Sequence, residues 1–493
     1  MKLNFLKIAL VFSGIVAVSS CKKLMDINKD PDNIPDSNSP IAQLLSSAQV
    51  NLGFEGGSDL YRYTALIAQH MTGEASQPNQ TYEYYRYNIT GSDQNNVWSS
   101  IFATTLSDLE LIIKQGSASP YYTGIAKILK AYEYSLVVDT WGDVPYTEAQ
   151  QLTANTAPKY DDDATIYPKL IVLLTEAITE LNAPSSVLTP GTNSLIYTGT
   201  YSTIKTNWIK LANTLKLRLF LHYSKKDPAF TVAQITALVN AGGPFMASNA
   251  DNFQMNFYNV ANQRNPISAF EVSRPNYLFA DARMLALMNA KVDPRRASYF
   301  TDFPVGSGNY VGVSGAAPPI APNNNYSRVH TFLRGAVTAT GAGTNSNTYT
   351  GAAPQRMLSF AEYNFIRAEA ALMGAPGSAQ QFFTDGITAS MTEAGVSAPN
   401  ITTYHAANGT LAGTNTQKLQ QIIEEKYIAL FGVSVEPWTD WRRTGYPALA
   451  APTNAIINTV PRSLFYPQSE IDLNPNAPAQ KASSLQDKIF WDN

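Results

Sequence analysis

Apolar residues recur at helical spacing through much of this 493-residue chain. Steps of three and four residues place side chains on one face of an α-helix, and that face must pack against another element. The sequence therefore predicts a mostly α fold. The stripes are Ile125, Ile128, Leu129, Tyr132 and Leu136; Ile166, Leu170, Leu173, Leu174, Ala177, Ile178 and Leu181; Trp208, Leu211, Ala212, Leu215 and Leu219; Ala361, Phe365, Ala368 and Leu372; and Leu419, Ile423, Tyr427 and Leu430.

The predicted helices follow one another in pairs. Paired helices with alanines where the backbones approach resemble tetratricopeptide units, although the spacing here is irregular. We expect one large domain of tetratricopeptide-like helical pairs over residues 41–493. The pairs are 97–115 with 121–138, 164–182 with 204–223, 359–374 with 377–395, and 416–432 with a short turn after Pro437.

Residues 243–356 lie between the second and third pairs and lack this periodicity. They are rich in Gly, Asn, Pro and aromatic residues, and only the stretch near 280–290 has a helical period. Long irregular segments on a rigid scaffold often carry binding residues. We therefore expect ligand contacts in this irregular insertion.

The chain contains a single cysteine, Cys21, so neither an intrachain disulfide nor a multi-thiolate metal site can form. Residues 1–20 have the basic start, apolar middle and small-residue end of a secretory signal peptide. Val18-Ser19-Ser20-Cys21 resembles the bacterial lipobox, in which the cysteine becomes the lipidated first residue. We predict a lipoprotein signal peptide over 1–20, lipidation at Cys21 and a tether over 21–40. The alternative is an ordinary signal peptide cleaved elsewhere, with the cysteine incidental.

Charge and composition narrow the class of partner. The formal net charge is −3, from 35 basic and 38 acidic residues without long blocks of either sign. This balance argues against a nucleic acid partner. The 27 tyrosines and the many neutral polar residues suit a neutral polar ligand such as a glycan.

Several motifs in series carry a resemblance to a known family. The chain resembles the SusD/RagB family of outer-membrane nutrient-binding lipoproteins, from Cys21 to the C-terminal "KIFWDN". The motifs are "LMDINKDPDNIP" (24–35), "YSLVVDTWGDVPYTEA" (134–149), "PKYDDDATIYPKLIVLLTEAITEL" (158–181), "NWIKLANTLKLRLFLHYS" (207–224), "SFAEYNFIRAEAALMG" (359–374), "EEKYIALFGVSVEPWTDWRRTGYP" (424–447) and "VPRSLFYPQSEIDLN" (460–474).

The resemblance implies a protein lipid-anchored at the outer membrane and facing the cell surface. It would capture an oligosaccharide or another nutrient and deliver it to a SusC-like TonB-dependent transporter. Several members carry an acidic stretch after the cysteine, whereas this chain has Lys22 and Lys23 there. Attachment to the periplasmic face of the outer membrane is therefore an alternative to the cell surface. A lid with little ligand affinity of its own and a binder of peptides are the alternatives. The shared motifs are expected to be structural, with Gly142 setting a turn and Arg443 bonding carboxylates such as Asp440.

Two segments combine aromatic rings with hydrogen-bonding side chains, as a glycan site requires. We predict ligand-binding residues in both. The tyrosines of the first segment could instead alternate along a strand between core and solvent. The candidates are Tyr82, Tyr84, Tyr85, Arg86, Asp93 and Asn96 from the first segment, and Tyr258, Arg264, Tyr277, Tyr310 and Tyr326 from the irregular insertion.

No catalytic constellation is evident. Glu369, Glu424 and Glu425 lie on helical stripes, and no feature of the sequence places two of them across a cleft as a glycosidase needs. The acidic run at 161–163 precedes a helix and is expected to cap it rather than bind calcium. We predict neither an enzyme nor a bound metal or cofactor.

Overall fold

The computed structural model describes residues 40–493, apart from 74, 76–78, 152–153, 315–325, 342 and 344–345. The predicted signal peptide, Cys21 and the tether up to residue 39 lie outside the described residues. Helices dominate the described part, and the predicted mostly α, single-domain architecture is confirmed. The described helices are α3 (Ile41–Glu55), α4 (Asp59–Ile67), α5 (Gln80–Tyr85), α6 (Gly91–Ser99), the π-helix η3 (Ser100–Thr105), α7 (Leu106–Gln115), α8 (Pro120–Trp141), α9 (Asp163–Leu181), α10 (Tyr201–His222), α11 (Pro228–Asn240), the 3-10 helix η5 (Asn249–Asp251), α12 (Pro266–Ser273), α13 (Ala282–Ala290), α14 (Arg296–Tyr299), α15 (Thr331–Arg334), α16 (Phe360–Leu372), α17 (Ala379–Glu393), α18 (Ala398–Asn408), α19 (Asn415–Ala429), α20 (Glu436–Thr444), α21 (Gln468–Leu473) and the 3-10 helix η6 (Phe490–Asp492).

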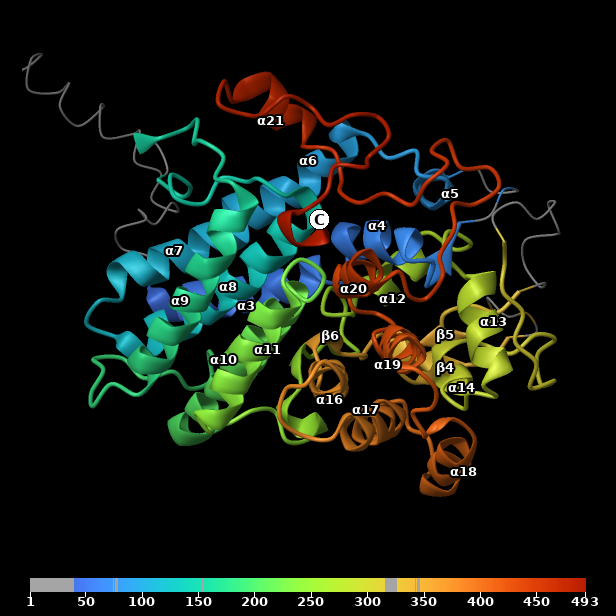
Figure 1. Cartoon of the computed structure of the whole chain (residues 1–493). Coiled ribbons are helices and arrows are strands. Elements are labelled where there is room, and N and C mark those ends of the chain that lie inside the picture. The colour runs from blue at the N-terminus through green and yellow to red at the C-terminus, as the bar shows by residue number, and fades with distance from the viewer. Residues whose placement is uncertain are drawn as a thin grey trace, which may run out of the picture.

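Helices α3 and α7–α11 form one side of the molecule, and α16–α19 form a second group beside them (Figure 1). Local sequence sets their ends. Helix α8 begins with Pro120 and ends at Gly142, whose φ of 81° favours glycine. Helix α9 begins after Asp162, whose carboxylate accepts a hydrogen bond from the backbone N–H of Ala164. The expected cap in the acidic run is thus present.

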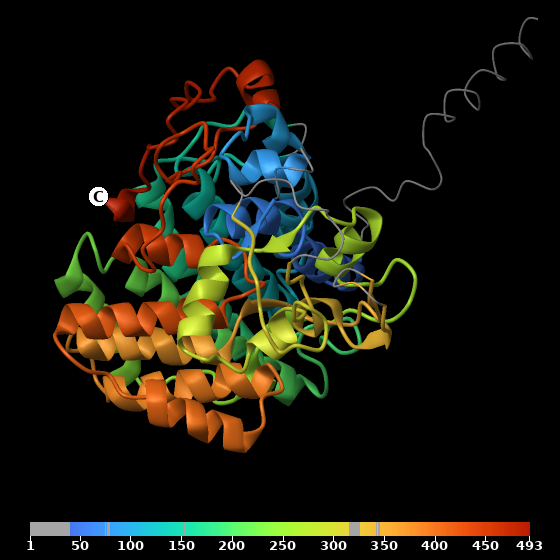
Figure 2. The same ribbon diagram turned by 90° about the vertical axis from the view of Figure 1, so that its right-hand side faces the viewer.

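The irregular insertion contains more regular structure than its sequence predicts. The expected helix near 280–290 is α13, but α12, α14 and α15 and several short strands are also present. Each strand spans two to four residues, too few to give a periodic sequence signal. The strands pair antiparallel as β1 (Met71–Thr72) with β3 (Phe279–Ala280), β2 (Phe253–Met255) with β6 (Gln355–Leu358), and β4 (Val337–Ala339) with β5 (Thr348–Tyr349). Figure 2 shows the insertion, in yellow, beside the helical scaffold.

A buried ionic network joins α10, α16, α19 and α20. Arg218 of α10 donates two hydrogen bonds of 2.7 Å to the carboxylate of Glu362 on α16. Arg443 of α20 makes the same kind of pair with Glu369, at 2.6 and 2.9 Å. These four side chains are at most 3% exposed. The predicted role of Arg443 in bonding carboxylates, Asp440 included, is confirmed.

Lys426 of α19 lies between these two pairs. Its ammonium group donates to Glu436 at 2.8 Å and to Asp440 at 3.0 Å. Burial alone would raise the pKa of Glu436, but Lys426, His222 and Arg218 together hold it well below its usual value. Each buried charge is therefore matched by an opposite charge in hydrogen-bonding contact.

The C-terminal segment closes this core. The indole N–H of Trp491 donates to Asp139 of α8 at 2.9 Å, across 352 residues of sequence. The carboxylate of Asp492 accepts hydrogen bonds from Lys225 at 2.6 Å and from Arg462 at 2.6 and 2.7 Å. Trp491 is fully buried, so the end of the chain is part of the core rather than a loose tail.

Two carboxyl groups lie buried together between α3 and α8. Glu55 is 2% exposed and Glu133 is 1% exposed. Ser100 and Thr105, from the π-helix η3, donate to one oxygen of Glu55 at 2.6 and 2.9 Å. Burial raises the pKa of Glu55 to about 7, and burial together with the charge of Glu55 raises that of Glu133 well above its usual value. The folded protein therefore holds protons here that the unfolded chain releases.

We expect Arg218→Met to destabilise the fold by about 3–5 kcal/mol, because it leaves Glu362 buried without its bidentate partner. The double variant Arg218→Met/Glu362→Met removes both charges and should recover most of this loss. Urea unfolding of the wild type and the two variants measures the difference. Equal losses in the single and double variants would contradict the network's role.

The carboxyl pair predicts a pH-dependent stability. Because the folded pKa of Glu55 is about 7 against 4.5 for the ordinary side chain, this group's contribution to stability is fully present at low pH and is lost as the pH rises through this window. At pH 8, Glu133→Gln should raise the free energy of unfolding by on the order of 2 kcal/mol and flatten the pH profile. Glu176→Gln, which changes an exposed carboxylate on α9, is the control. Urea midpoints from pH 4.5 to 8.5 provide the test, and parallel profiles for wild type and Glu133→Gln would refute it.

Candidate functional site

A polar pocket lies where α4, α5, α6 and α12 meet. Its volume is 320 Å³, which is at the lower end of the range for small-ligand sites. Nearly all of its lining side chains carry a hydrogen-bonding group. The lining residues are Asp59, Arg62, Tyr63, Gln80, Tyr84, Ser92, Asp93, Asn96, Phe270 and Arg274.

Local capping fixes one wall of this polar pocket. Thr90 and Asp93 form a capping box at the start of α6, in which the Asp93 carboxylate accepts from the backbone N–H of Thr90 at 2.8 Å. The hydroxyl of Tyr84 donates to the other carboxylate oxygen of Asp93 at 2.9 Å. Tyr63 donates to the Asp93 carbonyl at 2.6 Å, and Gln80 donates to the Tyr84 hydroxyl at 2.6 Å. These bonds hold the wall in a single arrangement.

Phe270 of α12 forms the aromatic part of the opposite wall. The guanidinium groups of Arg62 and Arg274 lie over this one ring, 4.3 and 5.4 Å from its centroid. Arg62 also pairs with Asp59. Burial, as the largest cause, lowers the pKa of Arg62 to about 10, so it remains charged near neutral pH.

An apolar groove runs along another side of α12. Its volume is 690 Å³. Phe54 is 52% exposed here, and Tyr258, in the same loop as Phe257, is 55% exposed. Ala269 and Val272 of α12 line the groove, whereas Phe270 between them lines the polar pocket, so the two hollows share this helix. The groove is lined by Val50, Asn51, Phe54, Phe257, Ala261, Asn262, Arg264, Ala269 and Val272.

The structure brings part of the predicted ligand set together around α12. Tyr84, Asp93 and Asn96 line the polar pocket, and Arg264 lines the apolar groove. Tyr277 is half-buried with its ring edge-on to Phe270, at a centroid distance of 5.8 Å. These residues come from both predicted segments, which are far apart in sequence.

The other predicted residues lie elsewhere or below the surface. The tyrosine segment forms the helix α5 and a turn, not an alternating strand. Tyr82 is half-buried and accepts a hydrogen bond from Asn454, while Tyr85 is only 2% exposed. Arg86 lies 3.6 Å from Glu83. Tyr310 lies under Arg296, and Tyr326 is buried against Phe279, both away from the polar pocket.

Seven of the pocket residues were not among the sequence candidates: Asp59, Arg62, Tyr63, Gln80, Ser92, Phe270 and Arg274. Helix α4 is a nine-residue element and α12 an eight-residue element, and neither has a long apolar stripe. The available signal was local, namely Asn265 followed by Pro266, a typical helix start that would place Phe270 and Arg274 on or next to one helix.

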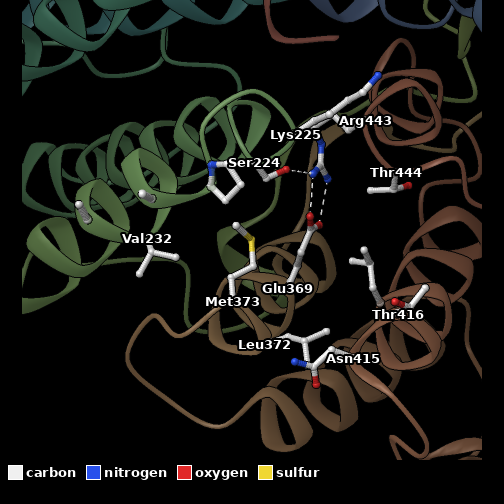
Figure 3. Close-up of a pocket in the computed structure, with 14 residues that line it drawn as sticks. Ser224, Lys225, Val232, Glu369, Leu372, Met373, Asn415, Thr416, Arg443 and Thr444 are labelled. Atoms are coloured by element: carbon white, nitrogen blue, oxygen red, sulfur yellow. Dashed lines mark hydrogen bonds and ion pairs between the residues drawn. The ribbon is translucent and has the colours of Figure 1, made fainter. Parts of the chain in front are cut away.

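A larger cavity of 890 Å³ lies between α11, α16 and α19 (Figure 3). Its walls are mainly aliphatic, including Val232, Leu372 and Met373. Figure 3 shows the Glu369 carboxylate and the Arg443 guanidinium turned toward each other at its edge, where they belong to the ionic network. None of the predicted ligand residues lines this cavity. This cavity offers few side chains that could hydrogen-bond the hydroxyl groups of a sugar, so the polar pocket is the better candidate for a sugar site.

The one group of three metal-ligating side chains found among the described residues is acidic. Oxygens of Asp143, Asp162 and Asp163 lie within 4.8 Å of one another. Asp162 caps α9, Asp143 accepts from the backbone N–H of Asp163 at 2.9 Å, and Asp163 accepts from that of Phe490 at 2.8 Å. These contacts fix the loop before α9, and they account for the acidic run by helix capping and loop structure.

Comparison with known families identifies the chain. The family described as SusD-like, starch-binding and associating with the outer membrane matches residues 32–467. The chain belongs to the SusD-like family. No match was found among curated protein sequences. Among the described residues, no helix of this SusD-like protein has both the length and the apolar content needed to cross a membrane.

Solved structures share the SusD-like fold. A structure titled as a chitin-binding protein is 24% identical and has a TM-score of 0.73, covering 92% of this chain and 100% of that chain. A chitin-binding SusD homologue from Flavobacterium johnsoniae is 23% identical with a TM-score of 0.74, covering 92% and 98% of the two chains. A SusD homologue from Bacteroides uniformis is 22% identical with a TM-score of 0.70, covering 91% and 99%. At these identities the likeness establishes the fold.

Proposed function

We propose that this SusD-like protein captures an oligosaccharide at the polar pocket and the adjoining apolar groove. One observation carries the proposal: hydrogen-bonding side chains and the rings of Phe54 and Phe257, from segments far apart in sequence, line the two hollows along α12. A sugar ring has apolar C–H faces and hydroxyl edges, and the two hollows supply a partner for each. Membership of a family described as starch-binding supports a carbohydrate ligand.

Within the polar pocket, the side chains that can hydrogen-bond the hydroxyl groups of a sugar are those exposed to solvent. Asn96, Ser92 and Gln80 are exposed, and each can donate and accept hydrogen bonds. Phe54 and Phe257 line the groove and offer aromatic faces to further sugar units. A chain of several sugars could therefore run from the pocket along the groove.

In this proposed function the protein binds its ligand and does not catalyse a reaction. Glycoside hydrolysis needs one carboxyl group as an acid and a second as a base or nucleophile. Asp59 is bonded to Arg62, and both carboxylate oxygens of Asp93 are occupied by the capping box and Tyr84. Glu369 and Glu425 are held in buried ion pairs with arginines. These carboxylates therefore serve structure.

We further propose that the protein is lipid-anchored through Cys21 and delivers its ligand to a SusC-like TonB-dependent transporter at the cell surface. The lipobox-like sequence before Cys21 and the family's description as associating with the outer membrane support this assignment. A lid that seals the transporter with little ligand affinity, and capture of peptides, are the competing functions. The binding experiment below separates all three.

Isothermal titration of the purified protein against starch-type, chitin-type and other oligosaccharides and against peptides should give heat with an oligosaccharide. Asn96→Ala and Gln80→Ala should each weaken that binding by about 3- to 10-fold, because each removes a hydrogen bond of about 1 kcal/mol. Gln420→Ala, which changes an exposed amide on α19, should leave affinity unchanged. Heat with peptides only would favour peptide capture, and no heat with any ligand would favour the lid.

The proposed lipid anchor on Cys21 can be tested by labelling and by cell fractionation. Cys21→Ser should abolish metabolic labelling of the protein by radioactive palmitate and release it from the membrane fraction, because acyl chains at this residue supply the membrane affinity. Ser20→Ala, which keeps a small residue before the cysteine, is the control and should be labelled like the wild type. Unchanged labelling of Cys21→Ser would show that the lipid is attached elsewhere.

A further inference from the structure

Arg274 is a cation without a protein counter-ion at the mouth of the polar pocket. It follows α12 as the C-cap residue and is exposed. Its guanidinium contacts the hydroxyl of Ser273 at 3.4 Å, a weak and neutral partner. In the part of the chain that the structure describes, no carboxylate lies within 4.0 Å of it. Arg62 in the same pocket differs, because it pairs with Asp59.

Arg264 repeats this situation at the other end of α12. It is exposed, lines the apolar groove and has no carboxylate within ion-pairing distance among the described residues. No acidic residue lines that groove. The helix between the two arginines spans eight residues, about 12 Å at the usual rise. One guanidinium group therefore lies at the polar pocket and the other lies at the apolar groove, at opposite ends of α12.

The carboxylates that line the polar pocket do not neutralise the positive charges of Arg274 and Arg264. Asp59 neutralises Arg62, and Asp93 is directed at the start of α6, where its oxygens accept from Thr90 and Tyr84. Phe270, beneath both Arg62 and Arg274, also holds the Arg274 guanidinium in place through its ring face. A positioned guanidinium with free N–H groups can bind a carboxylate or a sulfate through two parallel hydrogen bonds.

We propose that the ligand is an anionic oligosaccharide, with one acidic group bound by Arg274 at the polar pocket and another bound by Arg264 beside the apolar groove. This inference rests on the proposed function and narrows its ligand class. Two arginines at opposite ends of α12 require acidic groups on more than one sugar unit. Carboxylate and sulfate share the required chemistry, and the ligands below distinguish them.

The test compares ligands that differ only in charge. Isothermal titration of the purified protein would use hexagalacturonate against its methyl ester, and a sulfated galactan oligosaccharide against its desulfated form. We expect one acidic ligand to bind at least 10-fold more tightly than its neutral partner, with affinity that falls as salt rises. Arg274→Gln and Arg264→Gln should each reduce this difference in affinity, because each removes the partner of one acidic group.

Lys159→Gln is the matched control, since it removes one positive charge from a side chain that is 72% exposed on another loop. An equal loss in this control and in Arg274→Gln would overturn the inference, because the effect would then reflect net charge. Equal affinity for acidic and neutral partners would also overturn it and leave the proposed function standing. No binding to any oligosaccharide, acidic or neutral, would end both proposals.

Discussion

The buried ionic network is the constraint on which the rest of the structure depends. The side chains of Arg218, Lys426 and Arg443 are buried, and each is matched by carboxylates from other helices or, for Arg443, also from the preceding turn. Because an unmatched charge in this position is very costly, α10, α16, α19 and α20 can pack in few arrangements. Apolar stripes alone would tolerate sliding of one helix past another. The network therefore fixes the register of the scaffold that presents α12 and its two hollows.

The proposed ligand surface around α12 is built in a different way from the scaffold. Around α12, the elements are short and the capping bonds are local, as in the Thr90–Asp93 box. Such elements depend on contacts with the scaffold rather than on their own length. Side chains on such a wall, Arg274 among them, can be substituted without altering the core, because the rigid helical scaffold does not depend on them.

The sequence predicted the long helices and the overall class because apolar periodicity over three or more turns is a strong signal. It also selected Tyr84, Asp93, Asn96 and Arg264, which the fold brings together at α12. It did not reveal that Tyr85 and Tyr326 turn inward, because burial in short segments is decided by tertiary contacts. Phe270 and Arg274 were missed because α12 is too short to stand out within the irregular insertion. Whether the selected residues bind ligand remains a prediction.

The burial of Trp491 and Asp492 has a consequence for the rate of folding. Asp139 on α8 receives its indole partner from a residue 352 positions later in the chain, and Asp492 bonds Lys225 across 267 positions. Contacts between residues so far apart in sequence require closure of a very long loop, which makes them slow to form. We therefore expect this part of the core to complete its hydrogen bonds late in folding.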